Sequence, residues 1–213
     1  MITLDELWQY LLEETGQSLF EGLPEITYDQ EKFKRFVQSV LSVYSKYCPV
    51  ERSFNITVTG LRYDFTNHEH GVPEWLSKVM LVSYPWGVIT GERRSLFDFK
   101  LTIPPLRPWI YRKPVLYVSV NGVYDVIALY NHEIQEDDSG NYYIETINHD
   151  DDLFLKLLTG RFLQRIGRAR RAFTLNELPI TSDAAEIIAE GKEMETEVLE
   201  ALGELGKWYV ALS

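Results

Sequence analysis

Cysteine is nearly absent from the 213-residue sequence, which contains only Cys48. A single cysteine cannot form a disulfide within the chain, and it cannot supply the several thiolates of a cysteine-based zinc site. The sequence also lacks an apolar run near the length of a membrane span, and no basic region precedes an apolar stretch at its N-terminus. We therefore expect no signal peptide and no membrane span, in a chain made and kept in a reducing cytosol.

Positive charge is also scarce, with 21 lysines and arginines against 32 aspartates and glutamates, a formal net charge of -11. Such a chain is not expected to bind an anionic membrane, and direct binding of nucleic acid is not expected either, apart from what a local basic patch allows. What the sequence does contain is 45% apolar residues, including 13% aromatic residues, which is enough for a sizeable core. We expect a folded protein rather than a disordered one.

The stretch from Asp151 to Phe173 predicts a long amphipathic helix, because its apolar residues recur at three- and four-residue spacing. Acidic residues open it and arginines close it, which suits the helix dipole. Gly160 and Gly167 lie seven residues apart, on nearly the same face of this helix. Each glycine costs a helix about 1 kcal/mol relative to alanine, so we expect another backbone to approach closely there.

Other helices are predicted on both sides of this one. The first covers residues 1–15, with Thr3 or Asp5 as its cap, and the second covers about residues 29–47. After the central helix we expect an extended connector over residues 173–183 and a final acidic helix that Gly206 ends.

Strand patterns fill the middle of the sequence. They cover Phe54–Val58, Val79–Tyr84, Leu96–Ile103, Val115–Val120, Val123–Tyr130 and Tyr142–Ile147. Asn121-Gly122 predicts a two-residue hairpin turn between the fourth and fifth of them.

These elements predict an α+β fold with N-terminal helices, a small antiparallel β-domain and a C-terminal pair of long helices. The expected ranges are 1–50 for the N-terminal helical segment, 51–149 for the β-domain, and 150–213 for the helical pair and its tail. We expect the three ranges to form one compact unit.

The arginines of the central helix form the first candidate site. Arg161, Arg165 and Arg168 follow one helix face. They could pair with the glutamates of the final helix, contact an acidic partner subunit, or bind nucleic acid, and the acidic surroundings weigh against the last.

Aromatic residues form the second candidate site, an interface with other subunits. The candidates lie beside prolines or in the apolar C-terminal tail: Trp86, Trp109, Tyr111, Trp208 and Tyr209. Large aromatic side chains are enriched at interfaces, although core packing is the other expectation for those beside prolines. We expect the tail to dock on the body of the chain or on a neighbour, since an exposed apolar end brings no benefit.

His68 and His70 carry the alternative hypothesis from another class, a metal-dependent enzyme, with Asp64 as a further ligand. A metal site requires at least a third ligand, and usually a fourth. The remaining histidines, His132 and His149, lie in turn-like surroundings elsewhere in the sequence. We therefore expect a solvated loop here and assign no metal, cofactor or catalytic residue.

The C-terminal third resembles the virion structural proteins of tailed bacteriophages. The residues that carry the resemblance are DDDLFLKLLTGRFLQRIGRARRAF, the connector TLNELPIT, the acidic helix and the terminal KWYVAL. The segment EKFKRFVQSVLSVYSKYCP is similar to helices that precede a small β-domain in neck and baseplate components.

The resemblance implies a non-enzymatic structural subunit that forms a ring at the head–tail neck or connector. A position in the baseplate or elsewhere in the tail is the alternative within the same class. The implied partners are copies of the same chain and other virion proteins. The implied location is the virion, after synthesis in the host cytoplasm.

Overall fold

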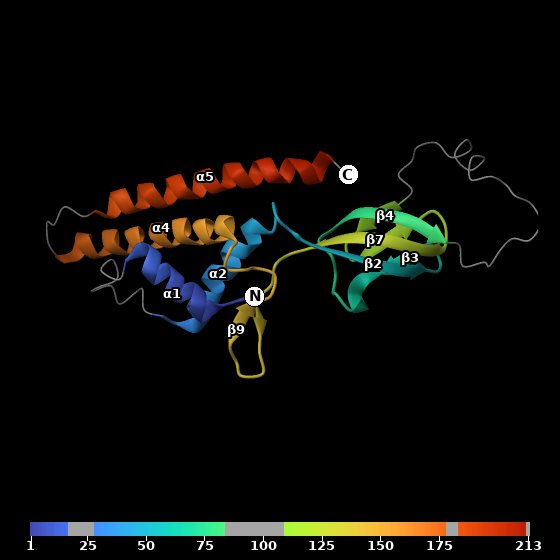
Figure 1. Ribbon diagram of the computed structural model, residues 1–213, viewed down its shortest axis with the longest axis horizontal. Coiled ribbons are helices and arrows are strands. Elements are labelled where there is room, and N and C mark those ends of the chain that lie inside the picture. Colours follow the sequence, from blue (N-terminus) through green and yellow to red (C-terminus); the bar gives the residue numbers. More distant parts are fainter. Residues whose placement is uncertain (17–27, 84–108, 178–182, 212–213) are drawn as a thin grey trace, which may run out of the picture. The chain divides into compact units, whose positions relative to one another are not determined.

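A computed structural model describes residues 1–16, 28–83, 109–177 and 183–211, without the side chains of residues 83, 172–177 and 206–211. Helices and three small antiparallel sheets make up this part of the chain (Figure 1), which confirms the α+β class. The expected strand Leu96–Ile103 lies outside the described residues.

The chain forms two compact units rather than one. Met1–Pro49 and Asn131–Leu212 form the first, which we call the helical unit, and Val50–Tyr130 form the β-unit. The β-unit thus ends at Tyr130 and not at residue 149. The physical reason is that the strand β9 (Tyr142–Ile144) pairs with β1 (Ile2–Thr3), at the start of the helical unit.

The first N-terminal helix begins at Thr3, one of its two predicted caps, and the second begins beside Asp29, near its predicted start. In α1 (Leu4–Thr15), Thr3 Oγ1 accepts a hydrogen bond from the Glu6 backbone N–H, and the Glu6 carboxylate accepts one from the Thr3 N–H, which together form a capping box. In α2 (Gln30–Tyr44), the Asp29 carboxylate accepts from the Lys32 N–H at 3.0 Å.

The C-terminal helices are longer than predicted. Helix α4 covers Asp152–Glu177 and α5 covers Ala184–Ala211. The connector that was expected to begin at residue 173 is therefore helical as far as Glu177, and Gly206 does not end the final helix. A glycine inside a helix costs only about 1 kcal/mol, so it terminates a helix only when its backbone turns into the left-handed conformation.

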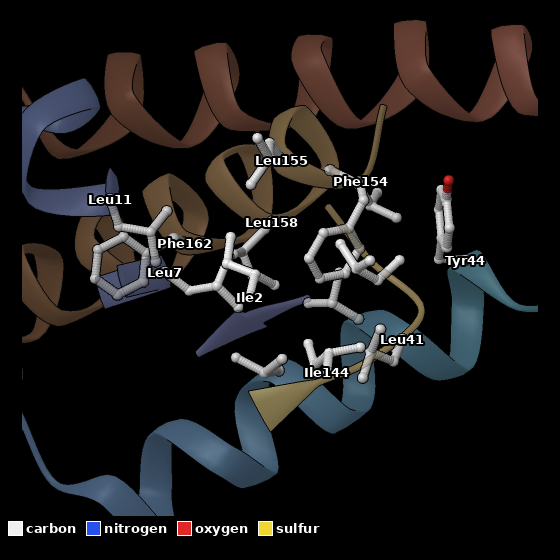
Figure 2. Close-up of a cluster of buried hydrophobic side chains, with 14 of the residues drawn as sticks. Ile2, Leu7, Leu11, Leu41, Tyr44, Ile144, Phe154, Leu155, Leu158 and Phe162 are labelled. Atoms are coloured by element: carbon white, nitrogen blue, oxygen red, sulfur yellow. The ribbon is translucent and has the colours of Figure 1, made fainter. Parts of the chain in front are cut away.

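The core of the helical unit is built from all four of its described α-helices, with Ile187, Val198 and Leu202 contributed by α5, and from β1 and β9 of the small β1–β9–β8 sheet. The third strand of this sheet, β8 (Gln135–Glu136), is exposed. Leu7 of α1, Leu41 of α2 and Ile144 of β9 surround Phe154 and Phe162 of α4 (Figure 2), and all five side chains are buried. The apolar stripe of the central helix is thus the surface on which this unit is assembled.

The β-unit contains two three-stranded antiparallel sheets that share one core. Their strands, in spatial order, are β2 (Val50–Val58), β7 (Gly122–Tyr130) and β4 (Trp75–Ser83), then β3 (Arg62–Asp64), β6 (Val115–Val118) and β5 (Trp109–Arg112). Phe65, Leu76, Leu116 and Val126 are fully buried between them.

The predicted Asn121-Gly122 hairpin is not formed. Strand β6 pairs with β3 and β5, whereas β7 pairs with β2 and β4, so the chain passes from one sheet to the other at Asn121. Gly122 lies in β7 opposite Val58. The two-residue turn lies instead at Gly60-Leu61, where both residues have positive φ (76° and 61°).

Candidate interaction surfaces

The predicted close backbone approach is found between α4 and α5, which run antiparallel. A Cβ added to Gly160 would lie 2.9 Å from the Gly191 carbonyl oxygen, and one added to Gly167 would lie 2.9 Å from the Ala184 carbonyl oxygen. A Cβ on Gly191 would approach the Gly160 oxygen to 2.5 Å. The expectation from Gly160 and Gly167 is confirmed, and Gly191 is the partner that the sequence did not single out.

Arg161 pairs within the chain with a glutamate of the final helix. Its Nε lies 2.9 Å from Glu195 Oε1, and both side chains are mostly buried, with 24% and 21% of their surface exposed. Its Nη1 also donates to the Ser39 carbonyl of α2. Arg161 therefore joins three helices of one unit, which is the first of the three possibilities raised for the arginine face.

Gln164 completes this network and was missed in the sequence analysis. It is 6% exposed, and its Nε2 donates to the Gly191 carbonyl and to Glu195 Oε2 at 2.7 Å. Burial raises the pKa of Glu195, but hydrogen bonds from Gln164 and Arg161 outweigh burial and hold that pKa below the ordinary 4.5. A glutamine on the buried face beside two glycines was the available signal.

Arg165 is half-buried, like Arg161, and Arg168 is exposed. The Arg165 guanidinium lies 5.6 Å from the centre of the Phe36 ring, at a distance typical of a cation–π contact. Arg168 donates to Gln164 Oε1 at 3.3 Å. These two arginines remain candidates for contact with an acidic partner.

The aromatic candidates have different positions. Tyr111 is 9% exposed and donates to the Pro73 carbonyl at 2.6 Å, so it is a core residue of the β-unit. Trp109 is half-buried and packs against the same core. Trp86 lies outside the described residues. Trp208 and Tyr209 are in α5, but their side chains lie outside the description.

Large exposed apolar side chains concentrate on the β-unit. Of nine among the described residues, six belong to it: Leu61, Trp75, Met80, Val82, Ile110 and Tyr117. Ile110 and Tyr117 are opposite each other on neighbouring strands. The available signal was the sequence of β4, WLSKVMLVS, which is apolar on both faces of the strand.

The candidate metal ligands are each engaged locally. Asp64 accepts hydrogen bonds from the Thr66 N–H and hydroxyl. The Nδ1 atom of His70 lies 3.0 Å from the Arg52 guanidinium, which can only donate, so that nitrogen must accept. His68 Nδ1 accepts from the His70 N–H.

No group of three or more histidine, cysteine or carboxylate side chains could hold a metal ion in the part of the chain that the structure describes. The histidine rings pack instead against an aromatic cluster, with His68 4.3 Å from the Phe54 ring, centre to centre. Burial is the main cause that lowers the pKa of His68, and the nearby His70 adds to it. His68, His70 and Asp64 therefore do not form the three-ligand site that the metal-enzyme hypothesis requires.

No protein-family model matches the sequence, and a search of curated proteins returns no match. Among the helices of the described part of the chain, none is long and apolar enough to cross a membrane.

Proposed function

We propose that this chain is a non-enzymatic structural subunit of a tailed-phage virion, assembled with its own copies into a ring at the head–tail neck or connector. The observation that carries the proposal is the apolar surface of the β-unit. Trp75 is 52% exposed, Val82 57% and Ile110 54%. Exposed apolar surface of this kind is typical of a face that meets another protein.

The outer face of β4 and β7 supports a contact with another subunit. Trp75 of β4 lies opposite Leu129 of β7. Ile127 is two residues from Leu129, so it lies on the same face of β7, and it is half-buried. Met80 lies opposite Asp125, the carboxylate of which is 3.6 Å from Lys78 Nζ. The single charged pair on this apolar face is thus neutralised locally, which lowers the cost of covering the face.

The helical unit and the resemblance support the virion assignment. Its arginines and glutamates pair internally through Arg161 and Glu195, as expected of a rigid building block. The segments that resemble tailed-phage proteins, residues 150–173 and the acidic helix after them, build this rigid helical pair. A contact between two different faces of identical subunits closes into a ring when the rotation between subunits is suitable.

The test is the assembly state of the full chain, measured by sedimentation and by electron microscopy. The double variant Trp75→Gln with Met80→Gln should dissociate the oligomer while the circular dichroism spectrum is unchanged. Thr57→Gln, an exposed position in the same sheet, is the matched control and should leave assembly intact. A chain that stays monomeric alone and labels no phage particle contradicts the proposal.

Labelled particles also separate the two positions within the virion. An antibody or gold label on this chain at the junction of head and tail supports the neck. A label at the distal end of the tail supports the baseplate alternative.

The proposed partners are proteins and not nucleic acid. Mixing the chain with duplex DNA at moderate salt should give no salt-sensitive binding. Binding that disappears in the double variant Arg165→Ala with Arg168→Ala would show that the arginine face is a nucleic-acid surface instead.

A further inference from the structure

The chain passes between the two units twice, at Pro49–Val50 and at Tyr130–Asn131. Within the helical unit, His132 connects the residues beside both crossings. Its Nε2 lies 2.8 Å from the Cys48 carbonyl oxygen, and its backbone N–H donates to Ser45 Oγ at 3.0 Å. The partners in these two bonds are far apart in the sequence: Cys48 lies 84 positions before His132, and Ser45 lies 87 positions before it.

The partners of the imidazole determine the tautomer of the neutral ring. The Cys48 carbonyl can only accept, so the proton of the neutral ring is on Nε2. Nδ1 then has a free lone pair and accepts from the Thr146 hydroxyl at 2.6 Å. A second proton on Nδ1 would occupy that lone pair and force the Thr146 hydroxyl to turn away and accept.

The surroundings disfavour the charged ring. His132 is 7% exposed, and this burial lowers its pKa from the ordinary 6.5. The hydrogen bond to the Cys48 carbonyl and the charge of Asp151 oppose the effect but do not cancel it. An imidazolium in this position lacks an ion-pair partner in direct contact among the described residues.

Among the described residues, Asp151 supplies the charge that acts on the ring. The Tyr44 ring lies 5.4 Å from the imidazole, centre to centre, and its hydroxyl donates to Asp151 at 2.8 Å. Burial raises the pKa of both Tyr44 and the Cys48 thiol, so both stay neutral. Glu133 and Glu145, next to His132 and Thr146 in the sequence, are exposed.

We propose that His132 is a pH-sensitive clasp, a contact that holds both chain crossings to the helical unit more strongly while its buried ring is neutral than when the ring is protonated. The clasp is complete above the ordinary pKa of a histidine, where folded and opened forms are both neutral. It weakens as the pH falls through the depressed pKa of the folded form, because the opened form binds a proton more readily.

Cys48 provides the assay, because it is the only cysteine and its carbonyl is part of the clasp. A pyridyl disulfide reagent labels the thiol of the full chain, and the rate is divided by that of the urea-unfolded chain at the same pH. We expect labelling to accelerate several-fold between about pH 7.5 and pH 5. The upper limit is about 30-fold, because at pH 5 protonation of a histidine with the ordinary pKa of 6.5 favours the opened form by that factor.

Two variants separate His132 from other titrating groups. His132→Gln keeps a donor for the Cys48 carbonyl and an acceptor for Thr146 but does not titrate, so its labelling ratio should not change with pH. His149→Gln, at an exposed histidine of the same unit, should keep the full acceleration. The proposal is overturned if the unmodified chain shows no acceleration, or if His132→Gln accelerates equally.

Nitrogen-15 NMR of the unmodified chain keeps the test decisive if His132→Gln does not fold. The His132 ring should show the Nε2-protonated neutral form at neutral pH and titrate below 6.5, together with amide signals of residues near both crossings. A ring that titrates at or above 6.5, or without those amide signals, overturns the proposal.

Discussion

Alanine at Gly191 is the sharpest test of the contact between α4 and α5. The added Cβ would lie 2.5 Å from the Gly160 carbonyl oxygen and 3.0 Å from the Gln164 backbone nitrogen. Backbone atoms cannot turn aside as a flexible side chain can, so the two helices must move apart. Overpacking of this kind costs about 1–3 kcal/mol, and exchanging glycine for alanine in a helix returns about 1 kcal/mol. We expect a net loss of up to about 2 kcal/mol of unfolding free energy.

Gly203→Ala in the same helix is the matched control, because no atom lies within 4 Å of its added Cβ. This variant should gain up to about 1 kcal/mol from helix propensity alone. Urea unfolding followed by far-ultraviolet circular dichroism measures both variants, since the described α-helices all belong to the helical unit. Gly191→Ala should be less stable than Gly203→Ala, and if the two variants are equally stable, the backbones do not approach as described.

Further predictions concern a cap, a turn and an ion pair. Thr3→Ala should lower the stability of the helical unit by about 1 kcal/mol in urea unfolding, because the N-terminal cap of α1 is lost, whereas Thr3→Ser should keep it. Leu61→Asn should be more stable than Leu61→Ala by about 1 kcal/mol in thermal unfolding, because asparagine tolerates the positive φ of 61° better; equal stability contradicts the strain. Glu195 has a depressed pKa, so its contribution is complete above 4.5 and is lost as the pH falls through the folded pKa. From about pH 5 to pH 3, the unmodified chain should therefore lose more stability than Glu195→Gln, and parallel losses would count against the pairing with Arg161.

The features that were predicted from the sequence are those that depend on residues close together in the chain. Thr3 caps α1 as predicted, because its side chain reaches the backbone N–H group three residues away. The cost of Gly160 and Gly167 inside a helix likewise predicted a close backbone without identifying it. In each case the physical cause lies within one or two helical turns.

What the sequence did not predict depends on residues far apart in the chain. Asn121-Gly122 has the composition of a hairpin turn, but Gly122 pairs with Val58, and the choice of partner is made by the shared core of two sheets. The hydrogen bonds of His132 and the buried position of Gln164 between two helices have no local pattern either. The unit boundary at Tyr130 follows from such a distant pairing, between β1 and β9.

The glycine contacts also determine how the helical pair responds to force. If α5 slid by one turn along α4, Ile187 or Glu195 would replace Gly191 against Gly160, where even a Cβ does not fit. These contacts therefore disfavour a slip of one turn in either direction, and we expect α4 and α5 to move together as one rigid element. A displacement of α5 would therefore displace α4 as well. Phe154 and Phe162 of α4 share a core with α1 and α2, so these two helices would also be affected.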